Sequence, residues 1–563
     1  MAAVDSHRMT ARFGEPARTR LVAAMLLVVA CGGSSTPAGP TLPPNSSGWW
    51  RDKTVYEVFV RSFADSDGDG IGDLAGLTAR LPALGHCAGV AATNTLGVDA
   101  LWLMPIFPSP SYHGYDVTDY TAINQQYGTL ADFDALVTAA HACGVKLVLD
   151  MVLNHSSGAH PWFANSVSGP TAARRDWYVW SETAASPGWS SPTGAGGSAW
   201  YQNNGAWYYG AFSYTMPDLN LTNPAVEAEL VRAMKFWLQR GVDGFRLDAV
   251  PYLVETGSGA GQRNQPATHA FLKRIRAALQ VEYPQALLVG EIWQSAPVVA
   301  SYFGGGDEVQ LAFTFDLADG LVGAAQSGIG GDLMNTIDAA EEALGGIDRG
   351  FQAPFLTNHD QVRVKRQLAG DAGASRVAAA ALFAMAGTPF IYYGEELGMQ
   401  GEPGGDDRAK RTPFRWTATA PGYGFTTGTP WYGATTEAAG VDLETQRADS
   451  TSSWNLYRSL IALRRAQPPL QGIGFSRLTA QPATAVSPVV VLRSAAGKRI
   501  LLVANFGTTP SGAFTVALPP PPPAAMEPSI LLGEGLAVPP SLVGITLSFA
   551  SMQPRGFAFI SLD

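Results

Sequence analysis

Residues 145–155 read VKLVLDMVLNH, an apolar run that ends in polar side chains. The run 145–150 is almost continuously apolar, which predicts a strand buried on both faces, as in a parallel sheet. Asp150, Asn154 and His155 stand where this strand ends. Charged groups there are costly unless they are solvated or paired, so the segment predicts a buried strand with functional groups at its carboxyl end.

The same unit recurs from residue 54 onward: a short apolar strand, a polar segment and a helical pattern. Eight such units in about 360 residues predict a (β/α)8 TIM barrel, a fold of the α/β class. The predicted strands are 54–60, 98–104, 145–150, 242–247, 286–290, 311–315, 353–357 and 389–393. The helical stretches include 129–143, 224–240, 266–282 and 376–386.

Such a barrel places its active-site groups after the carboxyl ends of the strands. Charged and imidazole side chains follow five of the eight predicted strands, in the segments 112–116, 150–155, 246–248, 291–293 and 358–360. One of these segments could hold a structural ion pair. Several around one rim predict an active site.

Composition narrows the function classes. The 563 residues suggest two to four domains at roughly 150 residues each. With 46% apolar and 15% charged residues, the chain is not disordered as a whole. Its net charge of 37 − 47 = −10, without a basic cluster, argues against a nucleic acid as partner. Plentiful aromatic residues permit a carbohydrate ligand, and three cysteines exclude a small disulfide-stapled scaffold.

The rim segments closely resemble the α-amylase family of glycoside hydrolases. LDMVLNH (149–155), GFRLDAV (244–250), GEIW (290–293) and FLTNHD (355–360) match its four main conserved regions in order and spacing. GVDALWLMP (97–105), MPDLN (216–220) and GTPFIYYGEELGM (387–399) match its accessory regions. The resemblance extends from about Trp49 to the C-terminus and implies the same barrel fold.

The resemblance implies retaining hydrolysis of an α-glucosidic bond, which needs two carboxyl groups about 5 Å apart. Asp248 matches the nucleophile, Glu291 the acid/base and Asp360 the third carboxylate. Arg246 precedes Asp248 by two residues, so both point to one face of the strand. We expect Arg246 to lower the pKa of Asp248 and Asp150 to anchor Arg246.

Other motif residues are assigned to the sugar. A lone histidine is usually a packed core residue, but three of the eight histidines fall on the rim motifs. The residues assigned to substrate binding are His113, Tyr115, Asp116, His155, Arg246 and His359, with Tyr115 as the aromatic platform. Asp150 and Asn154 are assigned to structural support.

Residues 65–73 read DSDGDGIGD, with carboxylates at alternate positions and glycines that allow a turn. This pattern suits Ca²⁺, and many relatives carry that ion in the first loop. The expected ligands are Asp65, Asp67, Asp69, the carbonyl of Ile71 and Asp73. The alternative is an acidic surface turn. The family's other Ca²⁺ site, near Asn154, is not expected, because the histidine that follows the nucleophile in other α-amylases is absent.

The N-terminus predicts export. Residues 21–30 form an apolar run too short for a membrane span and typical of a signal peptide, 1–30. The small residues before Cys31 resemble a lipobox, so Cys31 is predicted to carry a lipid, with 31–48 as a flexible tether. The alternative is an ordinary secretion signal. Either reading predicts an exported protein, a cell-envelope lipoprotein or a secreted one.

The rest of the chain divides into three domains. Barrel domain A takes 49–154 and 224–470, domain B takes 155–223 and domain C takes 471–563. Domain B holds six of the 14 Trp and, by the resemblance, walls the cleft. The runs 489–493, 500–505, 514–517 and 557–562 predict an antiparallel β-sandwich that supports packing. Cys87 and Cys143 lie at the same end of two predicted strands, as a disulfide or as two buried thiols.

The predicted activity is endo-hydrolysis of α-1,4 bonds in starch and maltooligosaccharides by a monomer that reaches membranes only through its lipid anchor. MPDLN lies between the motifs of oligo-1,6-glucosidases and neopullulanases, as in the intermediary group of the family. The alternative enzymes are an α-glucosidase and a maltodextrin transglycosylase or neopullulanase-like enzyme. A catalytically inactive binding protein of the same fold is disfavoured, because all three carboxylates are present.

Overall fold

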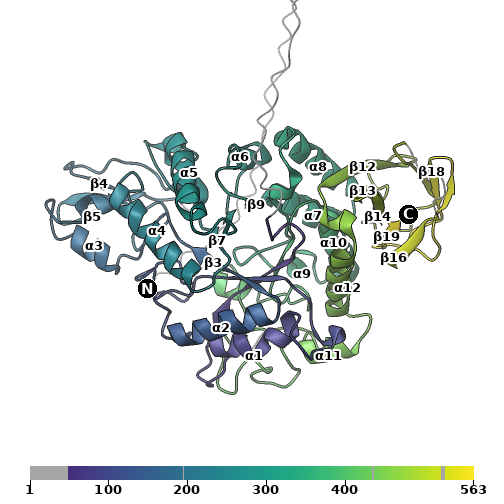
Figure 1. The fold of residues 1–563 in the computed structure, drawn as a ribbon, viewed down its shortest axis with the longest axis horizontal. Coiled ribbons are helices and arrows are strands. Elements are labelled where there is room, and N and C mark those ends of the chain that lie inside the picture. The colour runs from purple at the N-terminus through teal and green to yellow at the C-terminus, as the bar shows by residue number, and fades with distance from the viewer. Residues whose placement is uncertain (1–47, 195, 434–435, 521–526) are drawn as a thin grey trace, which may run out of the picture.

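The computed structural model describes residues 48–194, 196–433, 436–520 and 527–563 (Figure 1). The predicted signal peptide, Cys31 and all but the last residue of the tether lie outside the described residues. Among the described helices, none is both long and apolar enough to cross a membrane.

Eight parallel strands form the barrel, and all eight predicted strands are confirmed within a few residues. They are β1 (Val55–Val58), β2 (Ala100–Leu103), β3 (Lys146–Met151), β7 (Gly244–Leu247), β8 (Leu287–Gly290), β9 (Leu311–Phe313), β10 (Gln352–Ala353) and β11 (Phe390–Tyr392). Their order is β10-β9-β8-β7-β3-β2-β1-β11. Strands β10 and β11 stand at the two ends of this order. Next to them, the N–H groups of Thr388 and Phe390 donate to the carbonyls of Gln352 (3.0 Å) and Pro354 (2.9 Å) and so connect these two ends.

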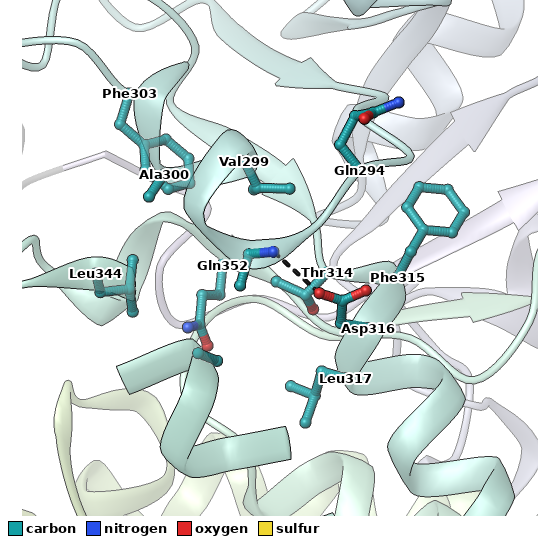
Figure 2. Close-up of a pocket in the computed structure, with 12 residues that line it drawn as sticks. Gln294, Val299, Ala300, Phe303, Thr314, Phe315, Asp316, Leu317, Leu344 and Gln352 are labelled. Carbon is teal, nitrogen blue, oxygen red and sulfur yellow. Dashed lines mark hydrogen bonds between the residues drawn. The ribbon is translucent and has the colours of Figure 1, made fainter. Parts of the chain in front are cut away.

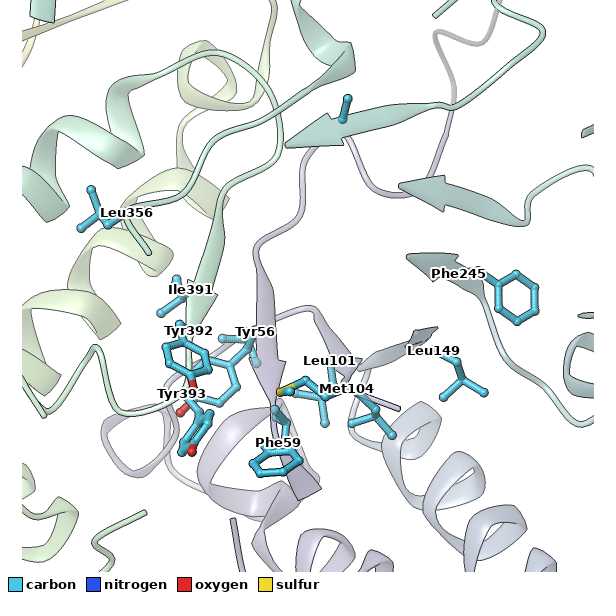
Figure 3. Packing of buried hydrophobic residues seen from close by; sticks show 14 of the residues in the cluster. Tyr56, Phe59, Leu101, Met104, Leu149, Phe245, Leu356, Ile391, Tyr392 and Tyr393 are labelled. Carbon is cyan, nitrogen blue, oxygen red and sulfur yellow. The ribbon is translucent and has the colours of Figure 1, made fainter. Parts of the chain in front are cut away.

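The strands are apolar along their whole length because both of their faces are buried. In β2, Ala100 and Trp102 belong to the cluster that fills the barrel interior. Leu101 and Leu103 alternate with them and belong to the larger cluster beneath the outer helices. Figure 3 shows members of this outer cluster, with Leu101 and Leu149 on neighbouring strands.

The helices surround the barrel and carry conventional end signals. Thr129 and Asp132 form a capping box at the start of α2, and Asp73 caps α1. The main helices are α1 (Leu74–Leu84), α2 (Leu130–Ala142), α4 (Pro224–Gln239), α5 (Pro266–Gln280), α7 (Phe315–Ser327), α8 (Gly330–Leu344), α10 (Ala372–Ala384) and α12 (Ser453–Ala466). The predicted helices are therefore found, with ends shifted by a few residues.

The insertion after β3 folds around a small antiparallel sheet. Its strands are β4 (Trp180–Ser181), β5 (Trp200–Asn203) and β6 (Ala206–Tyr209), preceded by α3 (Pro161–Ser166). Trp189 and Trp200 pack edge-to-face at 5.3 Å between ring centroids, and both contact Tyr209. These tryptophans therefore form a small core. The N–H of Leu219 donates to the carbonyl of Asn154 at 2.9 Å and joins the end of the insertion to the barrel.

The C-terminal residues form an antiparallel sheet of eight strands, so the predicted antiparallel structure is confirmed. The strands are β12 (Gly474–Gln481), β13 (Val489–Ala495), β14 (Lys498–Ala504), β15 (Phe514–Ala517), β16 (Ser529–Glu534), β17 (Ser541–Val543), β18 (Thr546–Phe549) and β19 (Phe557–Ser561). Strand β12 pairs with β13 along most of its length and with β15 at its end. The two parts of the sheet that it connects enclose a hydrophobic core of their own. This part lies beside α7, α8, α10 and α12 in Figure 1.

Cys87 and Cys143 are joined by a disulfide, the first of the two alternatives. The N–H of His86 also donates to the carbonyl of Cys143 at 2.8 Å. The link therefore ties the segment before β2 to the end of α2.

Candidate active site

The barrel register brings the polar rim residues together. Asp150 of β3 pairs with Arg246 of β7, and Leu247 of β7 pairs with Gly290 of β8. Because parallel strands end at the same edge, the residues that follow β7 and β8 emerge side by side. Asp248 and Glu291 are those residues.

Arg246 is the centre of the site and is almost fully buried. Its Nη1 lies 2.8 Å from Asp150 and 2.7 Å from Asp248, as the sequence predicted. Its Nη2 lies 2.9 Å from Glu291, a contact that the sequence did not predict. One guanidinium therefore contacts both candidate catalytic carboxylates, an arrangement compatible with the roughly 5 Å separation of a retaining glycosidase. The indole of Trp102 packs 5.1 Å from the guanidinium carbon.

Arg246 lowers the pKa of Asp248, as expected, but the net shift of that pKa is upward. Burial raises the pKa of Asp248 to about 6, and Arg246 offsets only part of this effect. Burial likewise raises the pKa of Glu291 to about 6, again against Arg246. The sequence showed the cation beside Asp248 but not the depth at which the pair lies, and desolvation outweighs the cation.

Glu291 has a second partner in the backbone. The N–H of Ala249 donates to Glu291 Oε2 at 2.9 Å. Ala249 has a φ of 50°, a left-handed conformation that is uncommon for a residue with a side chain. The chain therefore turns sharply at the residue after the nucleophile, whose N–H meets the neighbouring strand end. Sequence reasoning missed it, because an alanine carries no visible signal for this conformation.

Asp360 is held between two cations. His359 Nε2 lies 3.0 Å from one oxygen of Asp360, and Arg411 Nη2 lies 2.8 Å from the other. Burial alone would raise the pKa of Asp360, but His359 and Arg411 hold it well below its usual range. His359 also pairs with Glu57, and although burial opposes this, Asp360 and Glu57 raise the pKa of His359 to about 9. Sequence reasoning missed Glu57 and Arg411.

Tyr115, His113 and His155 are the remaining predicted residues at the rim of the barrel. The Tyr115 ring stacks on His359 at 5.6 Å, and its hydroxyl donates to Asp150 at 3.0 Å. Nδ1 of His113 accepts the N–H of Tyr115 at 3.1 Å, which leaves Nε2 of His113 as the donor. Nε2 of His155 is buried and has no hydrogen-bond partner among the described atoms. Burial lowers the pKa of His155 to about 3, so its ring is neutral.

Asp116 and Asn154, two of the predicted site residues, are buried and bond to other protein groups. Asp116 is buried, and its two oxygens accept the hydroxyls of Ser109 and Ser111, which organises the loop after β2. The structure therefore gives Asp116 a loop contact rather than a substrate-facing one. Asn154 Nδ2 donates to Asp218 at 3.0 Å, consistent with structural support of the insertion.

The acidic loop, residues 65–73, brings three carboxylates together. Asp65, Asp67 and Asp73 each offer an oxygen, and these atoms lie within 4.8 Å of one another. Convergent carboxylate oxygens fit a hard cation such as Ca²⁺. Asp69 lies in the same loop but outside this group, and its Oδ1 accepts the N–H of Ile71 at 2.7 Å.

A family model for the α-amylase catalytic domain matches residues 57–472. The chain belongs to the α-amylase family. The family model, together with relatives named as glycosidases, makes the protein an enzyme that acts on glycosidic bonds.

Individual relatives cover most of the chain. "Alpha-amylase 3" of Dictyoglomus thermophilum is 38% identical over 418 residues, 74% of this chain and 77% of that protein. A "Probable alpha-glucosidase" of Rhizobium meliloti is 35% identical over 485 residues, 75% of this chain and 83% of that protein. Among solved structures, the α-amylase from H. orenii superposes with a TM-score of 0.75 at 33% identity, covering 91% of this chain and 99% of that one.

An exposed aromatic stack at the rim was also missed. Trp293 follows Glu291 by two residues, is 48% exposed, and stacks on Phe315 at 4.5 Å with an interplanar angle of 11°. Phe315 also lines a small cavity between α6 (Ala296–Ser301), α7 and α8 (Figure 2). This cavity is mostly apolar and contains none of the three candidate carboxylates, so it is not the catalytic centre.

Proposed function

We propose that the protein is a retaining endo-hydrolase of α-1,4-glucosidic bonds in starch and maltooligosaccharides. The observation that carries this proposal is the contact of one guanidinium, that of Arg246, with both Asp248 and Glu291. A retaining mechanism needs a nucleophile and an acid/base close together, and an inverting one needs room for water between them.

In the first step, a carboxylate oxygen of Asp248 attacks the anomeric carbon while Glu291 gives its proton to the leaving oxygen. The bond to the leaving sugar breaks and a glycosyl–Asp248 ester forms. In the second step, the ionised Glu291 takes a proton from water, the water oxygen attacks the anomeric carbon, and the bond from that carbon to Asp248 breaks. A pKa near 6 lets Glu291 donate and accept protons close to neutral pH.

Asp360 supports the oxocarbenium-like transition state through the sugar hydroxyls, in keeping with its anionic state between His359 and Arg411. Nε2 of His155 is a buried donor without a partner among the described atoms, and a sugar hydroxyl would satisfy it. Hydrogen bonds of this kind strengthen in the transition state and supply several kcal/mol in glycosidases. Tyr115 serves as the platform beneath the same sugar.

The choice of bond rests on the motifs. MPDLN resembles the motif of the intermediary group with mainly α-amylase activity, and the Asp248-Ala249 pair resembles α-1,4-acting members more than oligo-1,6-glucosidases. The named α-amylase relative supports this, whereas the relative named α-glucosidase supports the alternative of an exo-acting enzyme. A maltodextrin transglycosylase or neopullulanase-like enzyme remains the other alternative. A binding protein without activity is disfavoured by the intact carboxylates.

Calcium is the proposed cofactor. Asp65, Asp67 and Asp73 would hold it, with Asp69 and the carbonyl of Ile71 as the further ligands predicted from the sequence. Bound there, the cation would neutralise the loop's carboxylates and fix its turn. The loop also caps α1 through Asp73, so the ion would stabilise the start of that helix.

We further propose that the protein is exported and acts as a monomer, anchored by a lipid on Cys31 or secreted. The division into domains A, B and C with the bounds given above belongs to the same proposal. The described structure joins Cys87 and Cys143 in a disulfide, as suits an oxidising compartment.

Reducing-sugar assays on soluble starch test the proposed activity. Wild type should release reducing ends from the interior of the chains, and Asp248→Asn should lose the activity by several orders of magnitude. Equal rates for both proteins would overturn the proposal. Maltose, pullulan, sucrose and trehalose, assayed in parallel, separate the alternatives, because an endo-acting α-amylase prefers starch to each of them.

A further inference from the structure

A second loop packs directly against the acidic loop. We call residues 425–431 the tryptophan loop. The N–H of Asp65 donates to the carbonyl of Phe425 at 2.9 Å, and the N–H of Trp431 donates to the carbonyl of Gly70 at 2.8 Å. The two loops are therefore joined at both ends by main-chain hydrogen bonds.

Glycines make this close contact possible. A Cβ on Gly70 would lie 1.9 Å from the carbonyl oxygen of Thr429, and a Cβ on Gly428 would lie 2.1 Å from that of Gly68. No side chain fits between the loops at these points. A shift of the acidic loop is therefore passed on to the tryptophan loop rather than absorbed by flexible side chains.

The indole of Trp431 continues the contact to the catalytic rim. Its Nε1 donates to Ser62 Oγ at 3.1 Å, and the Ser62 hydroxyl donates to the carbonyl of Arg411. The guanidinium of Arg411 in turn lies 2.8 Å from Asp360. These hydrogen bonds, connected through the residues Trp431 and Arg411 themselves, link Gly70 of the acidic loop to the third carboxylate.

The flat face of the same indole supports another part of the site. Trp431 stacks on Tyr112, with ring centroids 5.6 Å apart and an interplanar angle of 26°. The Tyr112 hydroxyl lies 3.5 Å from Arg411 Nη1, and its ring packs edge-to-face against His113. Trp431 therefore contacts both the loop after β2 and, through Ser62, the segment that holds Asp360.

We propose that Trp431 is a positioning residue: it fixes the positions of the Asp360 and Tyr112 side chains and makes those positions depend on the acidic loop. A divalent cation held by that loop would then tighten binding of an α-glucan chain at a site that it does not touch. The inference rests on the proposed glucan substrate and adds to it a residue through which the cation acts. Neither the indole nor the cation is assigned a contact with the reacting atoms.

Equilibrium binding in an inactive background tests the link. With Asp248→Asn present throughout, the affinity for maltoheptaose is measured by calorimetry, in Ca²⁺ and after chelation. Chelation should weaken binding about three- to tenfold when Trp431 is intact, the usual size of such couplings. With Trp431→Ala binding should be weak in both conditions, and with Trp431→Phe, which keeps the ring but not the N–H, it should be intermediate.

A matched pair of glycine variants tests the loop contact without metal. Gly70 and Gly497 both have positive φ (93° and 77°), but nothing lies within 4 Å of a Cβ on Gly497. Gly70→Ala should weaken maltoheptaose binding, and Gly497→Ala should not. Melting temperatures of all variants show whether they fold. The proposal is overturned if Gly70→Ala binds as Gly497→Ala does, or if chelation weakens the Trp431→Ala protein as much as its parent.

A substrate-free measurement separates this inference from the proposed function. Tryptophan emission is followed during Ca²⁺ titration of wild type and of Trp431→Phe. Most of the change should be lost in the variant, and equal changes would contradict the link. If the Asp248→Asn parent bound no maltoheptaose, the proposed substrate would be wrong, and the emission measurement would still decide the link.

Discussion

Glu57 forms an ion pair with His359, 302 residues further along the chain. Glu57 lies in the middle of β1, inside an apolar strand, and both side chains are almost fully buried. The pair orients the imidazole that holds Asp360, so a residue of the first strand helps to position the third carboxylate. Its stability effect has a defined pH dependence, because the pKa of His359 is raised to about 9.

Glu57→Gln should destabilise the fold by about 3 kcal/mol, the usual cost of removing one partner of a buried pair. The protonated His359 stabilises the fold fully at pH values below its ordinary pKa of 6.5. This stabilisation is lost once the pH has risen through the raised pKa of about 9. The difference in unfolding free energy between wild type and variant, measured in urea, should therefore be larger at about pH 6 than at about pH 10. The control is Glu182→Gln, an exposed partner of Arg175, which should cost less than about 1 kcal/mol. A pH-independent difference for Glu57→Gln would contradict this role.

The pH–rate profile should be bell-shaped and centred near pH 6, since burial raises the pKa of both Asp248 and Glu291 to about 6. Activity falls at low pH because Asp248 takes up a proton, and at high pH because Glu291 loses one. With α-maltosyl fluoride, whose leaving group needs no proton, Glu291→Gln should lose the alkaline limb and keep the acidic limb of glycosylation. An unchanged alkaline limb would assign the acid to another residue.

Trp293→Ala should raise the KM for maltooligosaccharides about tenfold, because an exposed ring held rigidly on Phe315 offers a stacking surface beside the acid/base. Trp293→Phe should recover most of the loss, since it keeps a flat ring at the same place. Initial rates over a series of chain lengths provide the measurement. An effect on kcat alone, equal for all chain lengths, would argue against a sugar contact.

Calcium should raise the melting temperature of the wild type, and Asp67→Asn should abolish this rise. At a hundredfold excess over the Kd, the binding is worth about 3 kcal/mol. Asp69→Asn should reduce the rise less: both side chains are exposed and accept one main-chain N–H, but only Asp67 belongs to the convergent group. An equal loss for both variants would show that Asp69 holds the ion as directly as Asp67 does.

The sequence was sufficient for the barrel, because strands buried on both faces are almost continuously apolar and the motifs end them in the expected order. It also placed Arg246 beside Asp248, two residues apart on one strand. It could not find Glu57, since a glutamate within a strand carries no mark of the histidine it will meet on another strand. It could not find Arg411 either, because the contact of Arg411 with Asp360 depends on how a long loop returns to the rim.

The pKa of Asp248 shows a second limit. A neighbouring arginine is visible in the sequence, whereas the burial of Asp248 is a property of the folded barrel, and burial has the larger effect on the pKa. The strained Ala249 and the contact of the tryptophan loop with the acidic loop are likewise products of backbone geometry. Sequence patterns report side-chain chemistry and periodicity, and these features depend on neither.

The most direct test of the central claim is the trapping of the covalent intermediate. Glu291→Gln is incubated with α-maltosyl fluoride, and the protein is then digested and analysed by mass spectrometry. This variant can form the ester from the fluoride, but it has no efficient base for hydrolysing it. The account predicts a maltosyl adduct on the peptide that contains Asp248, and no adduct in the double variant with Asp248→Asn. An adduct on another residue, or release of the β-anomer as first product from wild type, would contradict it.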